Sequence, residues 1–126
     1  MPLQLKLDTT SGVPFYRQMI DQILAGIATG ALRRGERLPT VRSLAVELAV
    51  NLNTVARAYK ELEIRGIVST QPGNGTFVAL ETVTLDEVER QRRLQQLVDD
   101  VLARAAAQGL SLREVRETLE EREGRS

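Results

Sequence analysis

Apolar residues recur at helical spacing in three segments of the first half of the chain. The first segment covers residues 14–29 and ends before Gly30. The second follows Thr40, a suitable N-cap, and reaches about Leu48. The third covers residues 52–65 and has its inward positions at Val55, Ala58, Tyr59 and Leu62. We therefore predict three amphipathic helices, of which the second is short.

The connections between these segments indicate how the helices are arranged. Only about four residues separate the second helix from the third, which is typical of a helix-turn-helix. Asn51 and Asn53 can each cap the third helix. Two runs rich in β-branched or aromatic residues, 67–71 and 76–79, then flank Pro72-Gly73-Asn74-Gly75 and predict a hairpin. Three helices followed by a hairpin form a winged helix-turn-helix.

A helical pattern returns from Thr84 and stops near Gly109. A last helix begins at Ser111, which forms a capping-box pattern with Glu114, and should give way to the charged residues 120–126. We expect this last helix to bury Leu112, Val115 and Leu119. The fold class is thus mainly α with a small β-hairpin, divided into residues 1–80, a winged helix-turn-helix domain, and 81–126, a helical hairpin. The apolar positions expected to form a dimer interface in the helical hairpin are Leu94, Leu97, Val98, Val101, Leu102, Val115 and Leu119.

Composition narrows the range of functions. The 126 residues include no Cys and no His, which excludes disulfides, thiolate nucleophiles, imidazole bases and the usual zinc ligands. No nucleophile is paired with a plausible base, so we predict neither an enzyme nor a bound metal or cofactor. No apolar run approaches the roughly 20 residues that span a membrane, and we expect a cytoplasmic protein.

Charge is distributed unevenly although the total is zero. Residues 1–80 carry nine basic and six acidic side chains, a net charge of +3, and residues 81–126 carry the opposite net charge of −3. This asymmetry is consistent with a polyanion-binding head and a tail that has another role. Small domains often carry net charges of this size, so the asymmetry alone does not identify a partner.

Base reading belongs to the third helix, because the second helix of a helix-turn-helix enters the major groove by its N-terminal end. Asparagine can pair with adenine, and arginine can bind guanine or a phosphate oxygen. The two glycines of the hairpin turn allow the backbone to approach a phosphate or the minor groove closely. The predicted DNA-binding residues are Thr40, Arg42, Asn51, Asn53, Thr54, Arg57, Gly73, Asn74 and Gly75. In the alternative interpretation, the asparagines only cap the helix, the arginines are solvated and the turn is ordinary.

Several segments, taken in order, resemble the GntR family of bacterial transcriptional regulators. They include Val13-Pro14-Phe15-Tyr16-Arg17-Gln18, Leu38-Pro39-Thr40-Val41-Arg42-Ser43-Leu44-Ala45, Gly66-Ile67-Val68 and Gly73-Asn74-Gly75-Thr76-Phe77-Val78. Residues 51–59 and the short helical tail are similar to the YtrA subfamily, whose members carry a small helical dimerisation region. The resemblance implies a homodimer that binds a pseudo-palindromic double-stranded DNA operator, usually as a repressor. It places DNA contacts at Arg42, Asn51, Asn53 and Thr54 and at the hairpin turn.

Two positions depart from that pattern. Many relatives carry arginine where this chain has Leu52 and Ala56, so guanine contacts at these positions are not expected here. The operator sequence is therefore open, as is a small-molecule effector, which the sequence does not identify. A second hypothesis makes the winged helix a protein-interaction module that docks a larger partner through its C-terminal helices.

Overall fold

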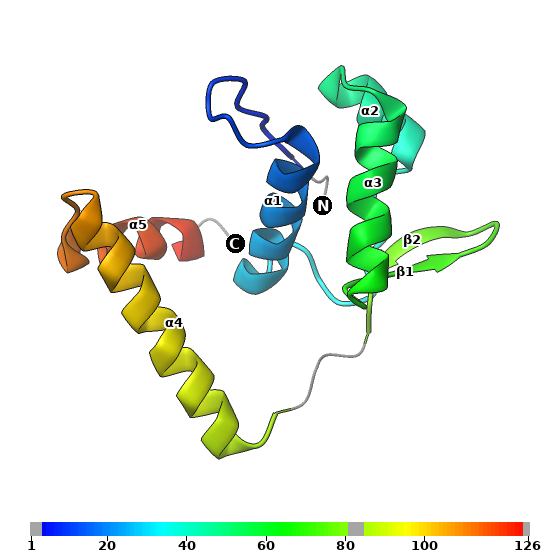
Figure 1. Ribbon diagram of the computed structural model, residues 1–126. Helices are drawn as coiled ribbons and strands as arrows, with labels where there is room; N and C mark the ends of the chain where they lie inside the picture. Colours follow the sequence, from blue (N-terminus) through cyan, green and yellow to red (C-terminus); the bar gives the residue numbers. More distant parts are fainter. Residues whose placement is uncertain (1–3, 81–84, 125–126) are drawn as a thin grey trace. The chain divides into compact units, whose positions relative to one another are not determined.

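The computed structural model describes residues 4–80 and 85–124. The chain forms two compact units, Met1–Glu81 and Thr82–Ser126, which we call the N-terminal and C-terminal units and describe separately. The N-terminal unit contains three helices and a hairpin, and the C-terminal unit contains two helices (Figure 1). In chain order these elements are α1 (Phe15–Thr29), α2 (Val41–Leu48), α3 (Leu52–Ile64), β1 (Val68–Gln71), β2 (Gly75–Val78), α4 (Glu87–Ala107) and α5 (Leu112–Gly124).

The helix-turn-helix is confirmed, and local capping fixes its boundaries. The hydroxyl oxygen of Thr40 accepts a hydrogen bond from the Ser43 amide at 3.0 Å and begins α2. Ala49 ends α2 in the left-handed conformation, with a φ of 55°, and turns the chain toward α3. The side chain of Asn51 then accepts from the Asn53 amide at 2.7 Å, so Asn51 is the cap and Asn53 is part of α3.

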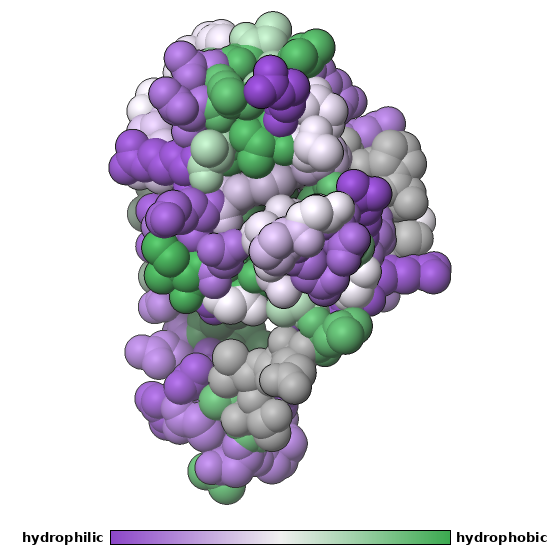
Figure 2. All heavy atoms as spheres, turned by 90° about the vertical axis from the view of Figure 1, so that its right-hand side faces the viewer, coloured by the Kyte–Doolittle hydropathy of each residue, from purple (hydrophilic) through white to green (hydrophobic). Residues whose placement is uncertain are grey.

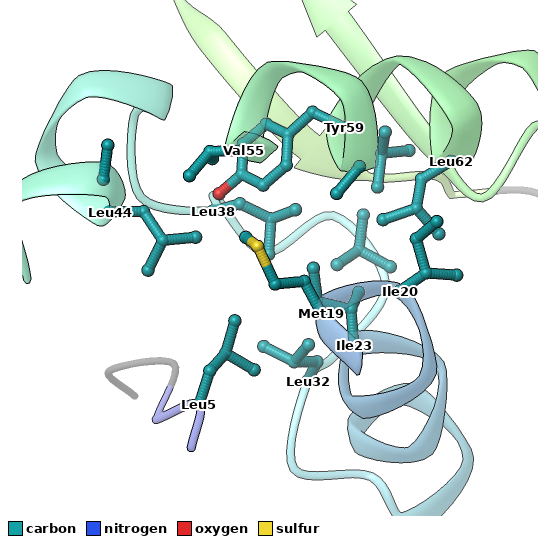
Figure 3. Packing of buried hydrophobic residues seen from close by; sticks show 14 residues of the cluster. Leu5, Met19, Ile20, Ile23, Leu32, Leu38, Leu44, Val55, Tyr59 and Leu62 are labelled. Atoms are coloured by element: carbon teal, nitrogen blue, oxygen red, sulfur yellow. The ribbon is translucent and has the colours of Figure 1, made fainter. Parts of the chain in front are cut away.

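The core of the N-terminal unit lies between the three helices, and α3 packs against both α1 and α2 (Figure 3). The four predicted inward positions of α3 are all buried, from Val55 to Leu62. The side chains of largest volume that solvent does not reach include Met19, Ile20, Ile23, Leu44, Val55 and Leu62. Each such side chain contributes about 1.5–3 kcal/mol through removal of apolar surface from water, so this cluster holds the three helix axes together.

The hairpin is confirmed. A further segment, for which the sequence predicted no strand, pairs with the free side of β2. β1 and β2 pair in antiparallel register, from Val68 opposite Val78 to Gln71 opposite Gly75. Arg37 forms an isolated antiparallel bridge with Phe77 of β2. The Leu38 amide donates to the Thr76 carbonyl at 2.8 Å, and the Gly35 amide donates to the Val78 carbonyl at the same distance. The polar stretch between α1 and α2 therefore borders the outer side of β2.

The C-terminal unit contains the two predicted helices, but the first begins later than predicted. Asp86, expected in the first turn, is instead the cap: its side chain accepts from the Glu89 amide at 2.8 Å, so α4 begins at Glu87 and Leu85 and Asp86 are not helical. Thr84, the predicted start, lies outside the described residues. After α4 the chain turns at Gly109, whose φ is +77°, and the Leu110 amide donates to the Ala105 carbonyl at 2.8 Å. These two features are those of a Schellman motif. The capping box is also present: the Ser111 amide donates to Glu114 Oε2 at 2.8 Å, and the Glu114 amide donates to the Ser111 hydroxyl at 3.2 Å.

Two expectations for the last helix are wrong. The charged residues at the end continue α5 as far as Gly124, because Glu and Arg are good helix formers and need no burial to stay helical. Leu112 and Leu119 are 52% and 61% exposed and Val115 is only half-buried, so α5 does not bury its apolar face within the chain. Two helices alone cannot cover each other on every side.

No helix in the described ranges combines the length and apolar character needed to cross a membrane.

The contrast between two residues at the end of α3 tests this packing. Leu62 is fully buried, whereas Ile64 is 75% exposed. The substitution Leu62→Ala should lower the free energy of unfolding by about 2–5 kcal/mol, because it leaves a cavity in the core. The matched change Ile64→Ala should alter it by less than about 0.5 kcal/mol. Urea denaturation followed by circular dichroism measures both, and equal losses would show that α3 does not pack as described.

Candidate nucleic-acid interface

The predicted DNA-binding residues lie at three places in the N-terminal unit: the start of α2, the start of α3 and the turn of the hairpin. The hairpin follows α3 and projects on the side of α3 away from α1 (Figure 1). Figure 2 views the molecule from the side on which the hairpin projects and shows hydrophilic side chains over much of the N-terminal unit. All the predicted DNA-binding residues lie within residues 40–75, which comprise α2, α3, β1 and the turn that leads into β2.

At the start of α3, the two asparagines have different tasks. The side-chain oxygen of Asn51 is engaged in the cap. Asn53 is exposed and lies one helical turn before Arg57, which is also exposed, so the two side chains share a face of α3. Thr54 beside them is half-buried. Asn53, which can pair with adenine, and the cation Arg57 therefore lie close together near the N-terminal end of α3.

Arg57 is held by an aromatic ring, so it is more than a freely solvated side chain. Its guanidinium carbon lies 3.8 Å from the centre of the Tyr16 ring, in the first turn of α1. Such a cation–π contact contributes about 0.5–1 kcal/mol at an exposed site. Tyr16 and Arg57 line an open hollow of about 610 Å³ together with Pro14, Phe15, Asn53 and Thr54. Tyr16 was not predicted as a site residue, because nothing in the local pattern of α1 relates it to a residue of α3.

A buried tyrosine of α3 fixes the start of α2. The Tyr59 hydroxyl donates to the Pro39 carbonyl at 2.7 Å. Tyr59 is only 5% exposed and lies among the buried residues of the core (Figure 3). Burial raises the pKa of the Tyr59 phenol, so the group remains a neutral donor. The bond anchors the residue before Thr40, and Arg42 follows two residues later with its side chain exposed. Tyr59 therefore links the core of α3 to the position of Arg42.

The turn lies where the sequence predicted a hairpin, and its geometry is well defined. Pro72 and Gly73 occupy the two central positions, Gly73 has a φ of +80°, and the Asn74 amide donates to the Gln71 carbonyl at 2.9 Å. These are the features of a type II turn. Gly73 and Asn74 are exposed, whereas Gly75 is half-buried and begins β2. The turn presents backbone groups and the Asn74 amide, but no charged side chain of its own.

The arginines near the starts of α2 and α3, Arg42 and Arg57, have no acidic partner among the residues that the structure describes. Ion pairs in this part of the chain join Arg17 to Asp21 at 3.9 Å and Arg65 to Glu61 at 3.4 Å. Arg42 and Arg57 form no ion pair within the described part of the chain. An arginine without a carboxylate partner keeps its N–H donors available for phosphate or guanine.

Three helices with a helix-turn-helix, a β-hairpin wing, and Arg42 and Arg57 near the starts of α2 and α3, without an ion pair to any described residue, define a winged helix-turn-helix DNA-binding protein. Comparison with known proteins agrees. Residues 15–78 match the family described as "Bacterial regulatory proteins, gntR family". The chain belongs to the GntR family of DNA-binding transcription regulators and, within it, is YtrA-like.

Two relatives show how far the similarity extends. The HTH-type transcriptional regulator Rv1152 of Mycobacterium tuberculosis is 49% identical over 75 residues, which are 60% of this chain and 62% of that protein. The chain thus matches less than two thirds of that relative's length. The HTH-type transcriptional repressor YtrA of Bacillus subtilis is 32% identical over 117 residues, 93% of this chain and 90% of that protein. The second match includes the C-terminal helices.

Two solved structures are similar to the chain. YtrA from Sulfolobus acidocaldarius, a GntR-family transcription factor, is 34% identical with a TM-score of 0.60, over 79% of this chain and 97% of that one. The DNA-binding domain of AraR, in complex with operator ORX1, is 26% identical with a TM-score of 0.54, over 63% of this chain and 99% of that one.

Alkaline titration tests the burial of Tyr59. The chain contains two tyrosines and no tryptophan, so the variant Tyr16→Phe has Tyr59 as its sole phenol. The ordinary phenol pKa is 10.0, and burial raises it in the folded state. The unfolded chain therefore ionises first, and the contribution of Tyr59 to stability falls as the pH rises above about 10. Absorbance at 295 nm should increase only together with unfolding seen by circular dichroism; an increase near pH 10 in the folded variant would contradict the burial.

Proposed function

We propose that this chain is a sequence-specific transcriptional regulator that acts as a repressor and binds a pseudo-palindromic operator as a homodimer. In this proposal α3 enters the major groove and the turn at residues 72–75 contacts the minor groove. The observation that carries it is the pair at the start of α3, the exposed Asn53 and the unpaired Arg57 held by Tyr16. The repressor role is supported by the name of the Bacillus subtilis relative.

Each residue at the start of α3 has a role that its geometry allows. Asn53 pairs with the edge of an adenine, and Arg57 binds guanine or a phosphate oxygen. The oxygen of Asn51 is used by the cap, so its amide group is left to donate to a phosphate. Leu52, which is 42% exposed, offers an apolar contact of the kind that a thymine methyl group accepts.

Phosphate contacts complete the proposed interface. Thr40 accepts the Ser43 amide through its hydroxyl oxygen, which leaves the hydroxyl hydrogen free for a phosphate. Arg42 follows on the exposed side of α2, and the backbone of Gly73 and Asn74 is accessible at the turn. Contacts of this kind position the protein on DNA, whereas the base contacts of α3 select the sequence.

The C-terminal unit, in this proposal, is the dimerisation region. Leu94, Leu97, Val98 and Val101 are 39–59% exposed and lie at spacings of three, four and seven residues on one face of α4. Leu102 of α4 and Val115 of α5 are half-buried, and Ala105 is the only buried apolar residue among 85–124. This unit therefore has almost no core of its own. A second copy of the same face would cover the apolar residues, and its two-fold symmetry would match two half-sites in DNA.

A hollow of about 270 Å³ lies beside α5. It is lined by Leu110, Glu114, Val115, Thr118, Leu119 and Arg122. We assign it to the dimer interface, because the surface inside the hollow is mostly apolar and Val115 and Leu119 are among its lining residues. The proposal therefore places no small-molecule effector there.

Selection of tight-binding duplexes from a random pool tests the proposed function. Inverted repeats with half-sites about one helical turn, roughly 10 bp, apart should be enriched. The variant Asn53→Ala should lose about 1–3 kcal/mol of discrimination at one base pair in each half-site. Competition between the selected duplex and single-base variants measures that loss. A pool that stays random, with binding lost at moderate salt, would contradict sequence reading.

Sedimentation tests the dimer with two matched substitutions in α4. Val101 lies on the apolar face, whereas Val88 is 81% exposed and lies off it. The wild-type chain should sediment as a dimer, and Val88→Glu should not change this. Val101→Glu should weaken dimerisation at least about tenfold, because it places a carboxylate in an apolar interface. A wild-type monomer would instead favour a module that docks a larger partner, and a dimer insensitive to Val101→Glu would place the interface elsewhere.

A further inference from the structure

The hairpin that would contact DNA carries no charged residue. Residues 68–78 include no Lys, Arg, Asp or Glu. Affinity for the DNA backbone comes largely from cations that replace the counterions of the phosphates. If the wing contributes to binding through charge, the charge has to come from another part of the chain.

Arg37 brings a cation to the hairpin from the segment before α2. It forms the antiparallel bridge with Phe77, and directly paired residues of antiparallel strands project from the same face. Gly75 precedes Phe77 by two residues in β2, so its missing side chain would project from that face as well. The Arg37 side chain thus starts beside Phe77 and has an open position next to it, nearer the turn.

The guanidinium occupies that open position. A Cβ atom added at Gly75 would lie 2.9 Å from Nε of Arg37, 3.3 Å from Nη2 and 3.4 Å from Cζ. The first distance is shorter than real Cβ contacts, so a side chain at residue 75 would displace Arg37. Gly75 also has a φ of +125°, which L-residues rarely adopt. The glycine therefore permits both the backbone path of β2 and the position of the arginine above it.

Arg37 has no competing partner within residues 4–80 and 85–124. It is exposed, it forms no ion pair there and its side chain makes no hydrogen bond in that part of the chain. The neighbouring Arg34, by contrast, donates to the Ala79 carbonyl at 3.4 Å. The donors of the Arg37 guanidinium are consequently available to a ligand beside the turn.

We infer that Arg37 is the phosphate-binding residue of the wing, held by the space that Gly75 leaves open. The inference rests on the proposed function. A phosphate fits better than a base, because the guanidinium lies beside the first residue of β2 and is set back from the turn at Gly73 and Asn74. From there it meets the backbone that borders the minor groove while the turn reaches toward the groove itself.

Salt-dependent binding tests this inference on the full chain. The variants are Arg37→Ala, Arg37→Lys and, as a control, Arg65→Ala at the C-terminal end of α3. The probes are the duplex selected by the wild-type chain and a scrambled duplex. Arg37→Ala should weaken binding to both duplexes about tenfold. It should also lower the slope of log affinity against log salt by about 0.9 for each bound protomer. Arg37→Lys should recover most of both, and Arg65→Ala should change neither.

A double-mutant cycle tests the part played by Gly75. Gly75→Ala should weaken binding in the wild-type chain but add little to Arg37→Ala, because both remove the same contact. Thermal melts of all variants by circular dichroism check that the fold is retained. An equal further loss in the Arg37→Ala background would overturn the role assigned to Gly75.

The outcomes separate this inference from the proposed function. If the wild-type chain binds the selected duplex and Arg37→Ala binds it with unchanged affinity and slope, the inference is wrong and the proposed function stands. If Arg37→Ala loses affinity for the selected duplex alone, with an unchanged slope, Arg37 reads bases and the phosphate assignment is overturned. If the wild-type chain binds no duplex at any salt concentration, the proposed function fails and the inference fails with it.

Discussion

The packing of α3 is the constraint on which the rest of the N-terminal unit depends. This helix has to fill the core with one face and offer polar side chains with the other, and its sequence does both within 13 residues. Val55, Ala58, Tyr59 and Leu62 fix its position against α1 and α2. The direction of Asn53 and Arg57 follows from that burial. Loss of the core would therefore also remove the geometry of the exposed face.

Contacts between elements refine what the core sets up. The Tyr59 hydroxyl extends from the core to the Pro39 carbonyl and so relates α3 to the start of α2. Tyr16 relates α1 to α3 by holding Arg57. Arg37 relates the segment before α2 to the wing. Each contact positions a cation or the residues next to one, which suits a surface whose partner is a polyanion.

The helices, their caps and the hairpin could be predicted because their signals are local. Thr40, Asn51 and Ser111 precede apolar periodicity, and the capping box of Ser111 with Glu114 is a pattern four residues long. The bridge between Arg37 and Phe77 had no such local signal, because the two residues are 40 positions apart in the sequence. The same is true of Arg57 and Tyr16. The burial predicted for the last helix was wrong for a different reason. A repeat of apolar residues predicts which face of a helix is apolar, but not whether another part of the same chain packs against that face.

We propose that two copies of this chain read one operator through α3 and the wing. Hydroxyl-radical and methylation footprinting of the wild-type chain on its selected duplex tests that claim most directly. The account predicts two symmetric major-groove segments protected about one helical turn apart, each with a protected backbone beside the adjoining minor groove. A single protected segment, or weak protection spread evenly along the duplex, would contradict it.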